Sequence, residues 1–126
     1  MPESSYEDER RRVCEAAAAN GYEDPDSLRE LLICTTSIVT APISKAYFAE
    51  RRNDARLLGL LVAIALEGED AGDAPWAAAN TIADFPAELL LPHKQSLEQL
   101  AAEEWTYLHI PGRLALAKIA AAGSAR

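Results

Sequence analysis

The 126-residue chain has few of the side chains on which catalysis and metal binding usually depend. It contains two histidines and two cysteines, and aromatic residues make up only 6% of it. No GxGxxG, P-loop, HExxH or CxxC motif is present. Neither His93 nor His109 has a metal-ligand partner three or four positions further on. We therefore predict that the protein is not an enzyme and holds no metal or cofactor.

The two cysteines are twenty positions apart, on segments that we expect to be helical. Cys34 lies between Ile33 and Thr35 on an apolar helix face, which favours a buried thiol. A catalytic cysteine would need a histidine or another base beside it. We predict that Cys14 and Cys34 are buried free thiols rather than a disulfide or a nucleophile.

Long hydrophobic runs and basic clusters are also missing. The longest apolar run, residues 57–66, is ten residues long, whereas a membrane-spanning helix needs about 20. The first nine residues are too polar for an export signal, so we expect a cytoplasmic protein. Arg10, Arg11 and Arg12 follow three acids, a pattern typical of ion pairs along one helix turn. We expect no membrane and no nucleic acid among the partners.

Alanine and leucine supply much of the 49% apolar content, and both favour helix. Together with regular capping and proline signals, they predict an all-α protein of about six to seven short antiparallel helices. We expect one domain over residues 1–126, with 1–4 and 123–126 frayed. The expected helices cover residues 5–19, 25 onwards, 40–52, 55–67, 73–85, 92–103 and 111–122, with a short turn at 87–91. The helix at 55–67 is almost entirely apolar and should be the central one.

Negative charge is concentrated in residues 67–104. This segment has nine carboxylates and one lysine, an excess of eight that equals the net charge of −8 of the whole chain. The rest of the chain is balanced, with eleven acids (20 − 9) and eleven bases (12 − 1). A local field of one sign can steer a partner of opposite charge.

Two parts of the second half are similar to each other. Asp73-Ala-Pro-Trp76 precedes an Ala-rich helix that ends in Ile82-Ala, and Glu103-Glu-Trp105 precedes a segment that ends in Ile119-Ala. The two tryptophans are 29 residues apart. This pattern resembles the inter-helix turn and second helix of HEAT-like repeats, most closely over residues 97–120. The resemblance implies stacked helix pairs within residues 55–122. An irregular helical bundle, in which alanine and tryptophan only pack, is the alternative.

The acidic turns are the candidate site. The loop at 67–73 has four carboxylates but not the ligand order of an EF-hand, so we expect a solvated loop or a docking site for a basic protein. Most other aromatic residues, Tyr107 among them, are expected in core or lid positions. Tryptophans ringed by carboxylates are typical of protein-binding surfaces. The predicted partner-binding residues are Glu69, Asp70, Asp73, Trp76, Glu103, Glu104 and Trp105.

These features favour a non-catalytic, acidic protein-binding module. The hypothesis that we prefer is an immunity or antitoxin protein that neutralises a basic toxin, such as a nuclease, because an acidic surface can mimic the charge of a phosphate-containing substrate. The alternative is a helical-repeat adaptor or scaffold subunit that binds its partner through an apolar groove.

Overall fold

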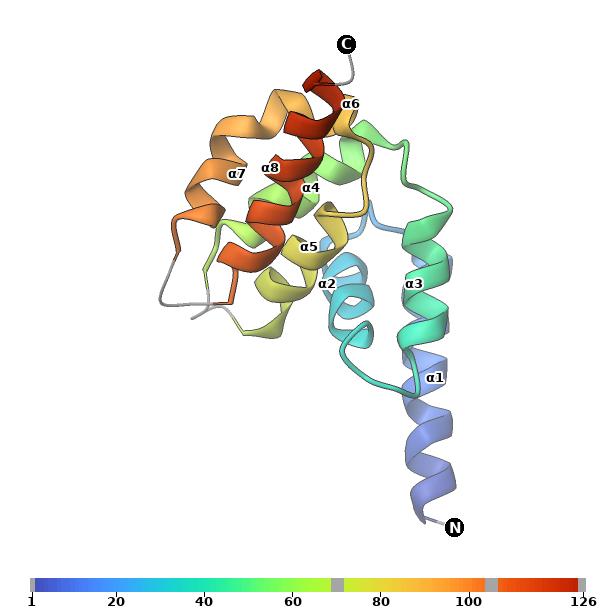
Figure 1. Cartoon of the computed structure of the whole chain (residues 1–126). Helices are drawn as coiled ribbons and strands as arrows, with labels where there is room; N and C mark the ends of the chain where they lie inside the picture. The colour runs from blue at the N-terminus through green and yellow to red at the C-terminus, as the bar shows by residue number, and fades with distance from the viewer. Residues whose placement is uncertain (1, 69–71, 104–106, 125–126) are drawn as a thin grey trace. The chain divides into compact units, whose positions relative to one another are not determined.

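The computed structural model describes residues 2–68, 72–103 and 107–124, and these ranges contain helices and no strand (Figure 1). The all-α prediction is therefore confirmed. The helices are α1 (Pro2–Asn20), α2 (Pro25–Cys34), α3 (Ala41–Ala49), α4 (Ala55–Ala65), α5 (Asp73–Ile82), α6 (Ala87–Leu90), the 3₁₀ turn η2 (Leu91–His93), α7 (Lys94–Ala101) and α8 (His109–Ser124). They divide between two compact units, Met1–Glu50 and Arg51–Arg126. Whether the chain folds as the single domain that we expected stays a prediction.

Several helices begin where local chemistry predicted. Asp24 precedes α2 in an extended conformation, with Pro25 as the first helical residue. Before α4, the side chain of Asp54 accepts a hydrogen bond of 3.1 Å from the backbone N–H of Leu57. This bond satisfies one of the four N–H groups that a helix start leaves unpaired. The chain leaves α1 through Gly21, whose φ of 87° is readily adopted only by glycine.

Other boundaries differ from the expectation. The helix expected over residues 40–52 ends at Ala49, because the chain must turn before Asp54 can cap α4. The helix expected at 92–103 is split into η2 and α7. The last helix begins at His109 rather than at Pro111. Pro111 fits within the first turn of α8 because the N–H groups of the first helical turn have no partner within the helix.

In the first unit, α1, α2 and α3 enclose a small apolar core. The side chains of Leu31, Leu32 and Cys34 are fully buried, and the rings of Tyr47 and Phe48 pack edge to face at 5.5 Å. The Tyr47 hydroxyl accepts a hydrogen bond of 2.8 Å from the N–H of Tyr22 in the α1–α2 turn. This bond links the α1–α2 turn to α3, so Tyr47 both fills the core and holds the turn in place.

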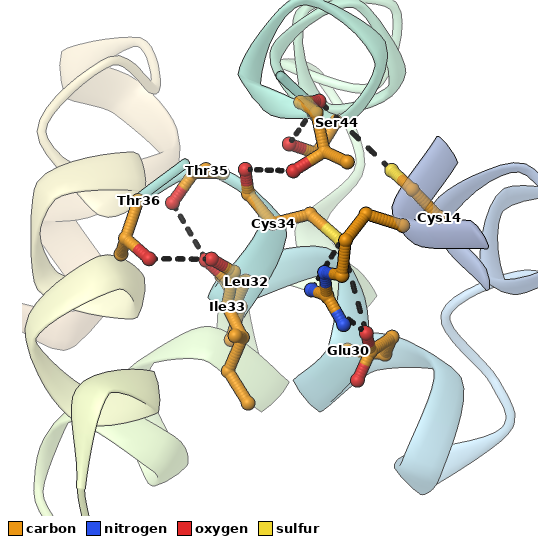
Figure 2. A network of polar contacts seen from close by, with 10 residues as sticks. Cys14, Glu30, Leu32, Ile33, Cys34, Thr35, Thr36 and Ser44 are labelled. Carbon is orange, nitrogen blue, oxygen red and sulfur yellow. Dashed lines mark hydrogen bonds and ion pairs between the residues drawn. The ribbon is translucent and has the colours of Figure 1, made fainter. Parts of the chain in front are cut away.

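Hydroxyl groups satisfy the backbone carbonyls at the end of α2 (Figure 2). The side chains of Thr35 and Thr36 each donate a 2.6 Å hydrogen bond, to the carbonyls of Leu32 and Ile33. The buried Thr40 donates to the carbonyl of Cys34 at 2.8 Å. Side chains that bond to the backbone in this way compete with helical hydrogen bonds, which explains why α2 ends here.

In the second unit, α4 and α5 form one antiparallel pair and α7 and α8 another, with α6 and η2 between them (Figure 1). One face of α4 is buried, with Leu57, Leu58 and Leu61 at 0% exposure, whereas Leu60 is 38% exposed. The prediction of an apolar helix buried at this position is thus confirmed for one face. A HEAT-like relationship remains a resemblance. Among the described residues, no helix is both long and apolar enough to cross a membrane.

Candidate protein-binding surface

The first acidic turn leads into α5 through Gly72, whose φ of 94° lies in the region that favours glycine. Asp73 follows in the first turn of α5, where the helix dipole stabilises a carboxylate. Trp76 comes one turn later and is 45% exposed. Asn80 is exposed as well, and its side-chain amide donates a 2.9 Å hydrogen bond to the Trp76 carbonyl. One face of α5 therefore exposes an acid, an indole and an amide.

The second acidic turn follows α7. Glu103 is exposed just after the end of this helix. Figure 1 shows that the end of α7 and the starts of α5 and α8 lie at the same end of the second unit. Of the predicted binding residues, Asp73, Trp76 and Glu103 are therefore exposed at one end of this unit. The other four, Glu69, Asp70, Glu104 and Trp105, lie outside the described residues.

Three exposed apolar residues near and on α8 were not among the predicted site residues. Tyr107, Ile110 and Leu114 are 69%, 50% and 59% exposed, respectively. The interval of four residues places Ile110 and Leu114 on one face of α8, and Tyr107 lies just before the helix. Tyr107 was expected in a core or lid position, and its exposure shows that it is not a core residue. The 3–4 spacing was visible in the sequence, but only the packing of α8 decides which face is covered.

A hydrogen bond joins α8 to the end of α5. The Lys118 ammonium group donates to the carbonyl of Ala83, just past the end of α5, at 3.1 Å. Both helices run in the same direction (Figure 1). We call Trp76, Asn80, Tyr107, Ile110 and Leu114 the α5–α8 seam.

The histidines and cysteines of the described part of the chain lie on four different elements, α1, α2, η2 and α8. No group of three or more His, Cys, Asp or Glu residues there is placed to hold a metal ion. His93 and His109 are half-buried at the starts of α7 and α8. Both cysteines are free and buried, in agreement with the sequence prediction. Their surroundings in the first unit explain how they behave chemically.

Cys14 is held in its neutral form. Burial, followed by a hydrogen bond with the Cys34 thiol, raises the pKa of the Cys14 thiol to about 12. Its sulfur also lies 4.0 Å from the Thr40 carbonyl oxygen, which disfavours a negative charge (Figure 2). Because the thiolate is the nucleophile, Cys14 has the opposite of the surroundings that a reactive cysteine requires.

This pKa predicts a specific alkaline sensitivity. The unfolded chain loses the Cys14 proton near pH 8.5, whereas the folded chain keeps it to about pH 12. The thiol therefore contributes stability below pH 8.5, and between these two pH values the free energy of unfolding should fall by up to about 1.4 kcal/mol per pH unit. Urea unfolding from pH 7 to pH 11, compared between wild type and Cys14→Ala, measures this. Parallel pH profiles for the two proteins would contradict it.

Comparisons with known proteins identify no relative: no protein-family model, curated protein or solved structure matches the chain.

Proposed function

We propose that this protein is a non-catalytic, acidic protein-binding module, and specifically an immunity or antitoxin protein that neutralises a basic toxin such as a nuclease. The observation that carries the proposal is the end of the second unit, where the exposed Asp73 and Glu103 carboxylates accompany the half-exposed Trp76 indole. The concentration of eight excess negative charges in residues 67–104 supports it.

The physical basis is charge mimicry. A nuclease active site is positively charged because it binds phosphate groups. An acidic protein surface can occupy such a site and is attracted to it over a distance of about one Debye length, roughly 8–10 Å at physiological salt. Carboxylates then set the rate of association, while an apolar anchor such as Trp76 slows dissociation once water has been excluded.

Neutralising the acidic turns tests this proposal. The variant carries Asn at Asp70 and Asp73 and Gln at Glu103 and Glu104, so size is kept and four charges are removed. Association with a basic partner protein isolated by pull-down with this chain should slow by an order of magnitude or more at low salt, because electrostatic steering alone raises on-rates by about 10–10³. Folding stability should change little at Asp73 and Glu103, since both side chains are exposed and exposed carboxylates contribute weakly. The association rate is measured with one protein immobilised on a sensor surface, over a series of salt concentrations.

A matched control separates the local field from net charge. Glu15, Glu23, Asp26 and Glu50 are all exposed in the first unit, and replacing them with Gln or Asn also removes four charges. This control should slow association much less than the variant in the acidic turns. Equal slowing by both would mean that only total charge matters. No effect of either at low ionic strength would remove the electrostatic argument.

The second candidate is the adaptor or scaffold subunit. The exposed apolar face of Tyr107, Ile110 and Leu114 favours it, because an apolar surface binds by burial rather than by charge. An adaptor of this kind should associate with its partner at a rate that hardly responds to salt. The same salt series therefore distinguishes the two candidates.

A further inference from the structure

The two thiols of the first unit lie against each other. Cys14 on α1 and Cys34 on α2 are fully buried, and a hydrogen bond joins their side chains. Figure 2 shows the two side chains pointing toward each other. The Cys14 sulfur lies 4.0 Å from the Thr40 carbonyl oxygen, and the Thr40 hydroxyl donates to the Cys34 carbonyl at 2.8 Å, so one residue contacts both cysteines. A bond between the two sulfurs would join α1 to α2.

A charged pair from the same two helices contacts the Cys34 sulfur and reaches the protein surface. Arg10 is one turn before Cys14 on α1, and Glu30 is one turn before Cys34 on α2. The Arg10 guanidinium forms a 3.3 Å ion pair with the Glu30 carboxylate, and both side chains are more than a quarter exposed. The guanidinium donates to Cys34 Sγ at 3.9 Å, and the carboxylate accepts from the Cys34 thiol at the same distance.

These contacts place a base beside Cys34. A carboxylate next to a thiol can take up its proton, and a guanidinium next to the sulfur stabilises the thiolate that results. The hydrogen bonds of Cys14 are instead with a carbonyl oxygen and with the other thiol, and burial raises its pKa. The two cysteines therefore differ chemically: Cys34 is placed to react first, and Cys14 is placed to react with Cys34.

We infer that Cys14 and Cys34 form a redox-sensitive pair, which hydrogen peroxide converts into a disulfide between α1 and α2. The Cys34 thiol gives its proton to the Glu30 carboxylate, and its sulfur attacks one peroxide oxygen. The O–O bond breaks, so Cys34 becomes a sulfenic acid and a hydroxide ion leaves. The Cys14 sulfur then attacks the Cys34 sulfur, the S–O bond breaks, and a second hydroxide ion leaves. The two thiol protons convert both hydroxide ions to water, so two thiols are oxidised and one peroxide is reduced.

The disulfide would act as a removable cross-link within the first unit. It closes a loop between positions twenty residues apart, which lowers the conformational entropy of the unfolded chain. We expect the Tm to rise by roughly 10 °C for a loop of this length. The inference does not depend on the proposed function, because oxidation is measured on the chain alone and the predicted binding residues belong to the second unit.

Peroxide treatment of the purified, reduced chain tests the pair. The intact mass should fall by that of two hydrogen atoms, and tryptic digestion without reductant should release residues 13–29 joined to residues 30–45. The Tm, followed by circular dichroism, should rise and then return to its first value after reduction with dithiothreitol. A wild type that keeps both thiols, only gains oxygen atoms or forms disulfide-linked dimers would overturn the inference. An unchanged Tm in the oxidised protein would overturn the cross-link as a stabilising device.

Two single variants test the order of the steps. In Cys14→Ala, the Cys34 sulfenic acid has no thiol to react with, so dimedone should trap it. In Cys34→Ala, Cys14 should stay an unmodified thiol under the same treatment, because no base accepts its proton. Circular dichroism shows whether each variant folds, and the mass measurement on the wild type stands without them. Dimedone labelling of Cys14 in Cys34→Ala to the same extent as Cys34 in Cys14→Ala would contradict the roles assigned to the two thiols.

Discussion

Replacing Leu61 with alanine is expected to lower the free energy of unfolding by roughly 2–5 kcal/mol, the range measured for fully buried leucines. Leu61 is 0% exposed, and its neighbours Leu57 and Leu58 on the same face of α4 are equally buried. Helix α4 packs against both α5 and α7. Leu61→Ala therefore leaves a cavity in the core of the second unit, and the surrounding side chains can fill it only in part.

Leu60→Ala is the matched control for this measurement. Leu60 is the next residue toward the N-terminus on α4 and is 38% exposed, so less apolar surface is returned to water when it is truncated. Both tryptophans of the chain lie within residues 51–126, so tryptophan fluorescence in a urea titration follows this unit. A loss below about 0.5 kcal/mol for Leu61→Ala, equal to that of a surface substitution, would mean that α4 is peripheral.

The sequence predicted the helix starts best, because capping is local chemistry. Asp24 before Pro25, and Asp54 three residues before Leu57, need only their immediate neighbours to act as start signals. The all-α class followed from alanine and leucine content together with these signals. Helix ends were predicted less well. The end of α2 depends on Thr40, whose hydroxyl bonds to the carbonyl of Cys34 only after the chain has turned back.

Whether the candidate residues bind a partner stays a prediction, and only part of their placement could be read from the sequence. Clustering of carboxylates is a property of the sequence, and Asp73, Trp76 and Glu103 are exposed in the structure. Which face of α8 would remain uncovered depends on tertiary packing. Ile110 and Leu114 could equally have formed the buried face, but Leu108 and Ala115 occupy it instead. The α5–α8 seam therefore became visible only from the positions of both helices.

A close contact between two helices of the second unit gives the other large expected effect. Gly112 of α8 lies against the end of α7, and a Cβ atom added there would be 2.9 Å from the backbone nitrogen of Ala101 and 3.0 Å from the Cβ of Leu100. These atoms belong to the backbone or are attached directly to it, so they cannot move without shifting α7. We expect Gly112→Ala to destabilise the protein by about 1–3 kcal/mol, as overpacking does.

Gly59→Ala provides the matched comparison, because the same substitution is made within a helix but without the close contact. A Cβ atom at Gly59 in α4 meets no atom within 4 Å. Alanine is favoured over glycine in a helix by up to about 1 kcal/mol, so Gly59→Ala should stabilise the protein by part of that amount. Both variants gain helix propensity, so the difference between them isolates the steric cost at the α7–α8 crossing. Urea titrations followed by tryptophan fluorescence should move the midpoint in opposite directions for the two variants. Equal stabilisation of both variants would contradict the prediction, because it would mean that α7 and α8 are further apart than the contact at Gly112 indicates.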